Sequence, residues 1–440
     1  MKKLVIIGAG PGGYEVAFEA SEKGLDVTLI DKDELGGTCL NYGCIPTKTL
    51  YKSAEIIKNI KNGSQFGIDA DYSVNFKQII DNKENVVSNL KQGIEFLIKK
   101  HKINFIKGEA SFVNENSISV NGEIIEGDYF IIATGSNVKI PNIEGVNSKN
   151  VVTSKEMLSL EKLPKSLTVI GGGVVGVELA SIYNQFGTEV TILEYQKNLL
   201  GFFEEDISKR FKPILSKQGI NVITNAAVTK IDDTDVYYNI KDKENNISSE
   251  LVLISTGRKS YTDNLKLDVI GVEYDLNGIK VNNDYETNVK NIYAVGDVIG
   301  GSMLAHTATF QSYKVLDIIL GEENKTDFEM FPACVFTFPE LASIGLTRKE
   351  AKDKYTDIVV KKGLYSANGK ANAMGEENGF IQIITHNDLI VGASIMGYSA
   401  STIIHEIAII ANSGKPLSEF KDMIFAHPTL SEVLSSAIRN

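Results

Sequence analysis

One pattern occurs twice in the chain: an apolar strand, a glycine-rich turn, a helical stretch and a second strand that ends in an acid. The acids are Asp31 in the first copy and Glu194 in the second, and each follows the first glycine of its turn by 23 residues. The spaced glycines are Gly8, Gly10 and Gly13 in the first turn, and Gly171, Gly173 and Gly176 in the second. The chain therefore contains an internal duplication whose two copies are in register.

The setting of these glycines gives them a physical role. A Gly-x-Gly-x-x-Gly turn between a strand and a helix allows a tight bend and a close backbone approach to a pyrophosphate. It also aims a helix N-terminus at that group, and the acid can bind ribose hydroxyls. A single fingerprint of this kind is weak evidence, but two matched copies are strong. The sequence predicts an α/β fold with two Rossmann-like dinucleotide-binding domains.

Two of the three cysteines, Cys39 and Cys44, follow the first copy directly. In a regular helix they would lie on different faces, whereas a disulfide needs Cα atoms about 4.4–6.8 Å apart. The backbone must therefore bend between them, and Gly43 permits this. Pro46 suits the first turn of a helix, which would place Cys44 at a helix N-terminus where a thiolate is favoured, with Lys48 on the same face. Two unrelated reduced cysteines in a turn are the alternative, and the neighbouring duplication favours a redox pair.

Composition narrows the function classes. A length of 440 residues suggests about three or four domains, and 43% hydrophobic and 23% charged residues are ordinary for a globular protein. The net charge of −11 argues against nucleic acid or an anionic membrane as a partner. The apolar residues 4–7 are a strand rather than a secretion signal, because Gly8 interrupts them. No stretch is long enough for a membrane span, so we expect a cytoplasmic protein in which any disulfide is catalytic.

Further strand-to-turn segments mark the rest of the chain. Residues 129–136 and 251–258 each form an apolar strand that runs into a turn, at Thr134-Gly135 and at Gly257. A third strand ends at Asp297. From about residue 331 short β segments and a helix near 400–413 predict an α+β domain.

With these segments the chain resembles the FAD-dependent pyridine nucleotide-disulfide oxidoreductases, and among them most closely the dihydrolipoamide dehydrogenases. The resemblance covers essentially all 440 residues. It implies four parts: an FAD-binding domain with the redox disulfide (1–145), an NAD-binding domain (146–262), a central domain that completes the FAD site (263–330) and an interface or dimerisation domain (331–440). It also implies a homodimer.

The resemblance implies roles for individual residues. Those expected at FAD are Gly8, Gly10, Gly13, Asp31, Gly37, Thr38, Lys48, Thr134, Gly135 and Asp297. Those expected at NAD are Gly171, Gly173, Gly176, Glu194 and Gly257. Those expected to be catalytic are Cys39 as the thiol that exchanges with substrate, Cys44 as the thiol against the flavin, Lys48 paired with Glu178, and His427 with Glu432.

The assignments of His427 and Glu432 come from residues 426–432, which match the His-Pro-Thr-Leu-Ser-Glu signature of the lipoamide enzymes. By this resemblance His427 is the acid–base and Glu432 orients it. A histidine before proline is more often a turn residue, but the carboxylate five residues later and the cysteine motif favour catalysis. Likewise Lys48 and Glu178 could be a surface ion pair, and their positions next to functional motifs favour a buried one.

The expected activity is oxidation of protein-bound dihydrolipoyl groups, with electrons passing through the Cys39–Cys44 disulfide and FAD to NAD. The partner would be a lipoyl-bearing protein of a 2-oxo acid dehydrogenase complex or a glycine cleavage system. Alternatives are another flavin disulfide reductase, such as a glutathione reductase-like enzyme, or a non-catalytic flavin and nucleotide sensor.

The sequence departs from the family pattern at three positions and leaves one cysteine without a role. Thr47, Thr307 and Phe425 stand where serine, lysine and a small or polar residue are common in the family, and they leave fine specificity open. No metal-ligand spacing links the histidines to the third cysteine, Cys334, so no metal is expected.

Overall fold

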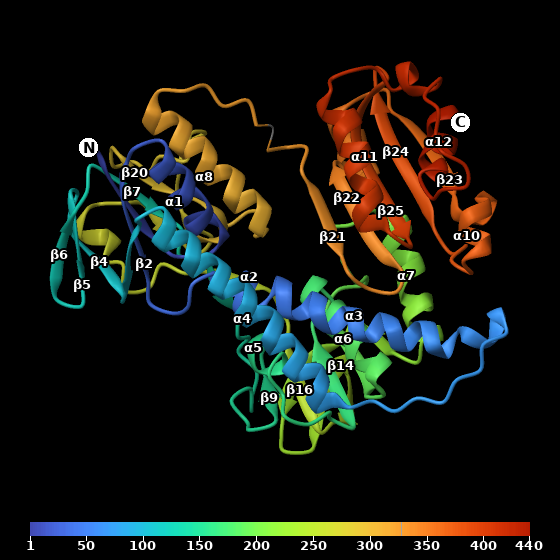
Figure 1. Ribbon diagram of the computed structural model, residues 1–440. Coiled ribbons are helices and arrows are strands. Elements are labelled where there is room, and N and C mark those ends of the chain that lie inside the picture. The colour runs from blue at the N-terminus through green and yellow to red at the C-terminus, as the bar shows by residue number, and fades with distance from the viewer. Residues whose placement is uncertain (327) are drawn as a thin grey trace.

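The structure, a computed structural model, describes residues 1–326 and 328–440. Its first part is a five-stranded parallel sheet, at the left of Figure 1. The strands in spatial order are β20 (Ile292–Ala294), β7 (Tyr129–Ile132), β1 (Lys3–Ile7), β2 (Asp26–Asp31) and β3 (Asn104–Lys107). The central strand β1 is buried from Leu4 to Ile7, which explains its uninterrupted apolar sequence. Two helices, α1 (Pro11–Glu22) and α8 (Ala305–Leu320), pack on this sheet.

The second copy of the pattern builds a second five-stranded parallel sheet, at the bottom of Figure 1. Its order is β12 (Asn221–Thr224), β11 (Glu189–Glu194), β10 (Ser166–Ile170), β16 (Leu251–Ile254) and β9 (Val151–Val152). The helices here are α5 (Ser154–Met157), α6 (Val174–Phe186) and α7 (Glu205–Lys217). The central strands of the two sheets are aligned alike, since Ile7 pairs with Ile30 and Ile170 pairs with Leu193.

Each unit carries a three-stranded antiparallel ribbon. The ribbons are β4 (Ala110–Asn114), β5 (Ser117–Val120) and β6 (Glu123–Glu126) in the first unit, and β13 (Ala227–Ile231), β14 (Asp235–Ile240) and β15 (Lys243–Ser248) in the second. The units are joined where β8 (Ser136–Val138) pairs with β17 (Arg258–Ser260). A short pair, β18 (Tyr274–Asp275) and β19 (Gly278–Ile279), precedes β20. The predicted fold of two Rossmann-like units is confirmed.

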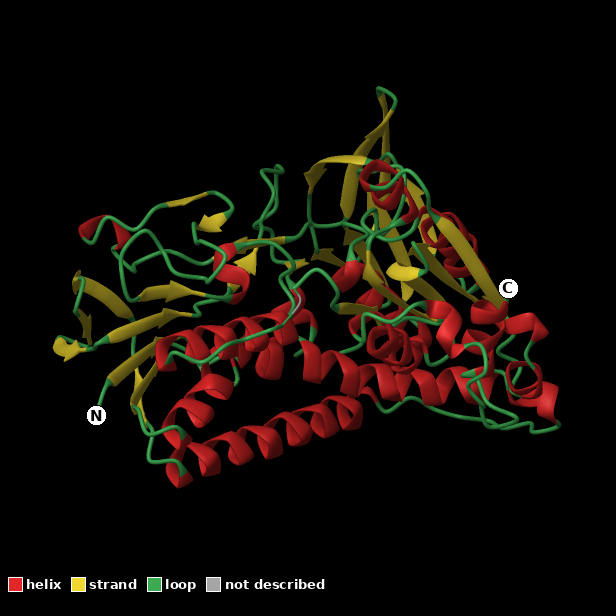
Figure 2. Cartoon of the chain, turned by 90° about the horizontal axis from the view of Figure 1, so that it is seen from above, coloured by secondary structure: helices red, strands yellow, loops and turns green. Residues whose placement is uncertain are grey.

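Three helices connect the first unit to the rest of the molecule: α2 (Gly37–Tyr42), α3 (Cys44–Lys61) and α4 (Phe76–Lys100). Figure 1 shows α3 running from between the two units towards the C-terminal part, and Figure 2 shows α4 as a long helix below the sheets. The N-terminus of α3 is Cys44, so the cysteine pair lies where the units meet.

The C-terminal part is a five-stranded antiparallel sheet with helices, as an α+β domain requires. The strand order is β21 (Pro332–Val335), β22 (Glu340–Gly345), β25 (Leu389–Gly397), β24 (Phe380–His386) and β23 (Val359–Leu364). The helices are α9 (Arg348–Lys354), α10 (Gly369–Ala373), α11 (Ala400–Asn412) and α12 (Glu432–Arg439). Residues of α11 and α12 form a core with one face of this sheet.

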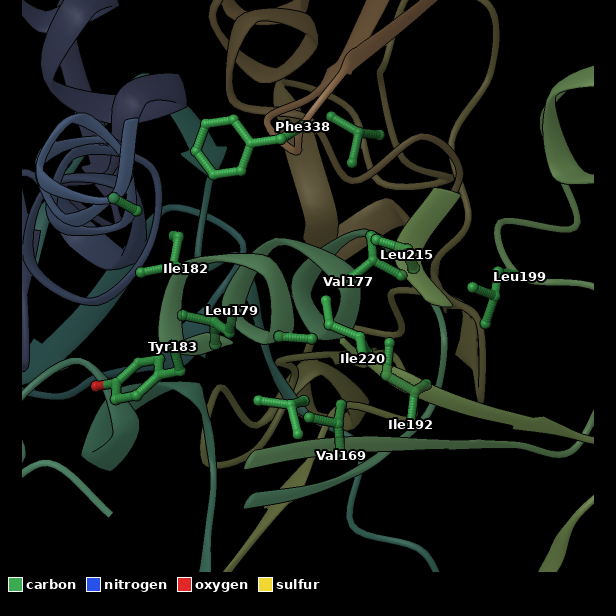
Figure 3. Close-up of a cluster of buried hydrophobic side chains, with 14 of the residues drawn as sticks. Val169, Val177, Leu179, Ile182, Tyr183, Ile192, Leu199, Leu215, Ile220 and Phe338 are labelled. Carbon is green, nitrogen blue, oxygen red and sulfur yellow. The ribbon is translucent and has the colours of Figure 1, made fainter. Parts of the chain in front are cut away.

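The largest core joins three parts of the chain. It contains Leu50 and Ala54 of α3, most of the inner face of α6, and Phe338 and Phe380 of the C-terminal part. Figure 3 shows Phe338 next to the helix that bears Val177, Leu179 and Ile182. Because these side chains are buried together, α3 is fixed against both the second unit and the C-terminal sheet.

Two further findings concern the whole chain. Strand β20, from the segment predicted as the central domain, belongs to the first sheet. The boundaries between the four predicted domains remain predictions. Among the residues described, no helix has both the length and the apolar character that crossing a membrane requires.

Candidate active site

One cavity of about 2140 Å³ joins the two dinucleotide-binding units and reaches β21 of the C-terminal sheet. It touches both glycine turns, both cysteines and the ends of β7 and β16. In open α/β sheets ligands bind at the carboxyl ends of the strands. The cavity lies at those ends in both sheets.

The first glycine turn is shaped by close backbone contacts. Gly8 has a φ of +111°, and a Cβ there would lie 2.2 Å from the carbonyl oxygen of Ala133. The amide of Ala9, the next residue, donates a hydrogen bond of 2.6 Å to Asp31, whose other oxygen accepts one from Asp33. Burial raises the pKa of Asp31, while these two amide donors oppose the rise. The turn and its acid thus form one rigid unit.

The second turn repeats this arrangement. Gly171 has a φ of +108°, and its Cβ would lie 2.5 Å from the carbonyl oxygen of Ser255. Gly172 donates to one oxygen of Glu194, and Gln196 donates to the other, both at 2.6 Å. The duplication therefore extends from the sequence to the hydrogen bonds of the acid.

The remaining glycines of the fingerprints divide into two kinds. A Cβ on Gly13 would meet the Gly8 carbonyl oxygen at 1.8 Å, and one on Gly176 would meet that of Gly171 at 2.2 Å. These two allow the helix to pack closely on its strand, and neither is among the described residues that line the cavity. Gly10 and Gly173 line it, and a Cβ on Gly173 would have no described atom within 4 Å.

Other residues expected at FAD surround the first turn. Gly37 lies so close to Gly10 that a Cβ would approach its Cα to 2.6 Å. Thr38, Thr134 and Gly135 line the cavity, and the Thr134 hydroxyl donates to the Tyr261 carbonyl oxygen at 2.7 Å. Asp297 accepts a hydrogen bond from Ser136.

These observations test whether dinucleotides fit. Both turns line one cavity, and in the first unit a Cβ at Gly8 or Gly37 would clash with the neighbouring backbone that shapes the turn. A helix begins directly after the second fingerprint glycine in each unit, α1 at Pro11 and α6 at Val174. The residues present fit a dinucleotide in each unit. Gly257, with a φ of +105°, also lines the cavity beside the second unit.

The cysteines lie on consecutive helices. Cys39 is in α2, Cys44 opens α3, and the helices meet at Gly43, whose φ of −147° and ψ of −108° provide the bend. Both residues are thiols in this structure, and both line the cavity.

The two thiols have unlike acidities. The hydrogen bond from Cys39 and, after it, the nearby Lys48 ammonium together lower the pKa of Cys44 to about 7, although burial opposes them. The same hydrogen bond, together with burial, raises the pKa of the Cys39 thiol. Cys44 is therefore the thiolate of the reduced pair, which makes it the better leaving group in exchange.

The structure brings Lys48 and Glu178 together. The Lys48 ammonium lies 3.1 Å and 2.9 Å from the two carboxylate oxygens of Glu178. Glu178, on α6, is 4% exposed, and it also accepts a hydrogen bond of 2.8 Å from the backbone N–H of Phe336. The buried carboxylate thus has a hydrogen-bonded partner for each oxygen, as burial of such a group requires.

His427 and Glu432 form a second cluster near the C-terminus. The ring Nδ1 of His427 lies 3.0 Å from Oε1 of Glu432, and the N–H of Thr429 donates to Oε2 at 2.8 Å. The Thr429 amide and then His427 lower the pKa of Glu432. The His427 side chain is 79% exposed, so its other ring nitrogen is open to a partner molecule.

Within one chain these clusters are apart. Of the residues described, those lining the cavity include Cys39, Cys44 and Lys48 but neither His427 nor Glu432.

Sequence reasoning missed two contributors to the site. Phe336 contacts both Glu178 and Lys48. Arg258 donates to the side chain and the carbonyl oxygen of Ser136, and its Nε lies 3.7 Å from a carboxylate oxygen of Asp297. Arg258 follows Gly257 directly, so its place after a functional turn is a signal that was available. Cys334 also lines the cavity, where burial raises the pKa of its thiol to about 12.

Comparison with known proteins agrees with this geometry. The family described as pyridine nucleotide-disulphide oxidoreductase matches residues 2–312, and its dimerisation domain matches residues 331–438. The chain belongs to the pyridine nucleotide-disulphide oxidoreductase family. This family works with FAD and NAD, so the expectation of these two cofactors is confirmed, and the chain carries the family's dimerisation domain.

Several members of this family are close to the chain over its whole length. A dihydrolipoyl dehydrogenase of Staphylococcus aureus is 37% identical, over 98% of this chain and 95% of that protein. One from Bacillus subtilis is 38% identical, over 99% and 97%. Among solved structures, the HOCl-induced flavoprotein disulfide reductase RclA from Escherichia coli is 31% identical with a TM-score of 0.89, covering 99% of both chains.

Proposed function

We propose that this protein oxidises protein-borne dihydrolipoyl groups to lipoyl disulfides, with NAD as the final electron acceptor. The observation that carries the proposal is the exposed His427 with its ring held by Glu432, in a chain that also presents two thiols of unequal pKa. Dithiol oxidation needs a base for the incoming thiol and a good leaving thiolate. The dihydrolipoyl dehydrogenases of S. aureus and B. subtilis, similar over nearly the full chain, support this choice.

The residues of the two units would hold the cofactors. The first turn with Asp31, Gly37, Thr38, Lys48, Thr134, Gly135 and Asp297 would bind FAD, and the second turn with Glu194 and Gly257 would bind NAD. Bound FAD supplies the two-electron relay between the dithiol and NAD. The protein aligns the reacting groups and supplies the charges around them.

The chain's own residues account for the bonds, protons and electrons of the thiol chemistry. In the oxidised enzyme His427 takes a proton from one substrate thiol, and the resulting thiolate attacks the sulfur of Cys39. A bond forms between substrate and Cys39 while the Cys39–Cys44 bond breaks, leaving Cys44 as a thiolate beside Lys48. The second substrate thiol then attacks the first sulfur, which closes the lipoyl ring and releases Cys39. The proton of this second thiol passes to Cys39, while His427 keeps the first proton. The substrate loses two electrons and the enzyme gains its dithiol.

We further propose that the site is shared in a homodimer. The cavity with the cysteines and the His427–Glu432 pair are separate within one chain, and the chain carries the family's dimerisation domain. A two-fold axis would bring His427 of one subunit to Cys39 of the other and make both sites equivalent. We expect the lipoyl-bearing partner to belong to a 2-oxo acid dehydrogenase complex or a glycine cleavage system in the cytoplasm.

A second candidate is a disulfide reductase that runs in the opposite direction. The full-length similarity to RclA, a flavoprotein disulfide reductase, favours it. Such an enzyme would use NADH as the electron donor to reduce a disulfide other than lipoyl.

Steady-state kinetics decides between the two. The purified protein, loaded with FAD, is assayed for NAD reduction by dihydrolipoamide and for NADH oxidation by lipoamide and by glutathione disulfide. Rapid turnover of dihydrolipoamide, lost in Cys39→Ser, supports the proposal. Turnover of glutathione disulfide with none of dihydrolipoamide would overturn it in favour of the reductase.

Reductive titration tests for a redox pair as such. An enzyme with a working Cys39–Cys44 pair takes up twice as many electrons as its flavin alone accepts. Uptake equal to that of the flavin alone would make the protein a flavin sensor.

A further inference from the structure

Three aromatic rings fill the space between α3 and the loop that joins β21 to β22. Tyr51, on α3, stacks on Phe338 with ring centroids 4.7 Å apart and ring planes 11° apart. Its ring also meets Phe336 edge-on, at 5.9 Å and 77°. The Tyr51 hydroxyl donates a hydrogen bond of 3.2 Å to the carbonyl oxygen of Thr337. One side chain thus contacts three consecutive residues of this loop.

The same loop holds the Lys48–Glu178 pair. The N–H of Phe336 donates to Glu178 at 2.8 Å, and the Lys48 ammonium lies 4.4 Å from the centre of the Phe336 ring. Phe336 therefore contacts both members of the pair, one through its backbone and the other through its ring. A shift of Phe336 would disturb both contacts at once.

The other end of the loop is fixed. Phe338 is 3% exposed and belongs to the core that also contains the inner face of α6, the helix that bears Glu178 (Figure 3). Burial raises the pKa of Tyr51 well above its ordinary value, so its hydroxyl remains a donor throughout the working pH range. Tyr51 thus ties Phe336 to an anchored neighbour and to α3, which begins with Cys44.

We propose that Tyr51 is a positioning residue of the redox site: by holding Phe336, Thr337 and Phe338 it keeps the Lys48–Glu178 pair in place beside Cys44. The proposal rests on the proposed function only in assigning redox chemistry to this site, because the contacts themselves lie within one chain. Lys48 lowers and Glu178 raises the pKa of the Cys44 thiol. Releasing Phe336 would loosen Lys48 and leave Glu178 less neutralised, and both changes raise that pKa.

The test compares Tyr51→Leu and Tyr51→Phe with a matched control, Phe76→Leu. Phe76 belongs to the same core, where its ring contacts Tyr183 and Phe186, at 6.1 Å each. Its loss removes an aromatic side chain without touching the loop. In each variant Cys39 is replaced by Ser, and the rate of alkylation of Cys44 by iodoacetamide is measured against pH in the FAD-loaded protein. Peptide mass mapping separates Cys44 from Cys334.

We expect Tyr51→Leu to raise the pH midpoint of alkylation by about 0.5 unit, a fraction of the 1–3 units that a neighbouring opposite charge produces. Tyr51→Phe keeps both ring contacts, so its pH midpoint should stay close to that of the protein with Tyr51 intact. With Cys39 intact, Tyr51→Leu should lower kcat for dihydrolipoamide by on the order of tenfold with little change in KM for NAD, as misplaced catalytic groups do.

If the midpoints of Tyr51→Leu and Phe76→Leu move equally or not at all, Tyr51 has only a packing role and the proposal is wrong. The alkylation experiment needs no lipoyl substrate. A wild-type protein that fails to oxidise dihydrolipoamide would overturn the proposed function but not this positioning role.

Discussion

At the residue scale the decisive feature is the unequal pair of thiols. Cys44 opens α3, accepts a hydrogen bond from Cys39 and lies near the Lys48 ammonium, and its pKa is lowered to about 7. A thiol loses its proton above its pKa, so the fraction of Cys44 that is thiolate in the reduced protein increases as pH rises through neutrality. Cys39, whose pKa is raised, keeps its proton.

This difference predicts different spectra for the two single variants. In the partly reduced holoprotein, Cys39→Ser should retain a long-wavelength thiolate-to-flavin absorption band that strengthens as pH rises, with no turnover. Cys44→Ser should lack the band at every pH, because it lacks the low-pKa thiol. Absorption spectra between pH 5 and 9 check both expectations, and lipoamide activity in both variants would exclude the assigned thiol chemistry.

Glu194 predicts the choice of nucleotide. Its carboxylate is fixed by the amides of Gly172 and Gln196 at the rim of the second turn. A carboxylate there binds ribose hydroxyls and repels a 2′-phosphate, so NAD should be preferred to NADP. The ratio of kcat/KM for the two nucleotides measures this, and Glu194→Ala should bring it closer to unity. Equal values in the wild type would contradict the role of Glu194.

At the element scale the two strand–turn–helix units depend on their first glycines. Gly8→Ala places a Cβ 2.2 Å from the Ala133 carbonyl oxygen at a φ of +111°, so the turn must open. The variant should purify without bound FAD. Gly24→Ala is the control: its φ is also positive, at +87°, but no described atom lies within 4 Å, so only backbone strain of roughly 1–2 kcal/mol is expected.

Flavin absorbance per polypeptide after purification measures the outcome. Retention of FAD by Gly8→Ala at the level of the control would show that the close approach in the first turn is not required.

The sequence was most informative where local rules act. Glycine spacing and apolar strands predicted both parallel sheets, and the Gly43–Pro46 segment predicted a helix that begins at Cys44. It was uninformative about contacts between distant elements. Nothing local to Phe336 marks it as the donor to Glu178, since 158 positions separate the two and only packing of the C-terminal sheet brings them together. The Lys48–Glu178 contact was expected from family resemblance rather than from any periodicity.

At the scale of the whole molecule, one chain contains all the groups that the proposed chemistry needs but does not bring them together. The cysteines lie in the cavity between the two units, while His427 is exposed on the C-terminal part beside the apolar loop that contains Met423 and Ile424. Ile424 is 93% exposed. Covering this loop with a second copy would bury apolar surface and place the base near a partner's thiols, which is why we expect an obligate homodimer.

The most direct test of this account is complementation between two inactive chains. Cys39→Ser and His427→Ala homodimers should each be inactive, while heterodimers assembled from one chain of each should contain one intact site, with Cys39 from one subunit and His427 from the other. We predict that verified heterodimers regain up to half the dihydrolipoamide activity of the wild type. Heterodimers without activity, or a wild-type protein that is monomeric by sedimentation at assay concentration and still fully active, would contradict the shared site.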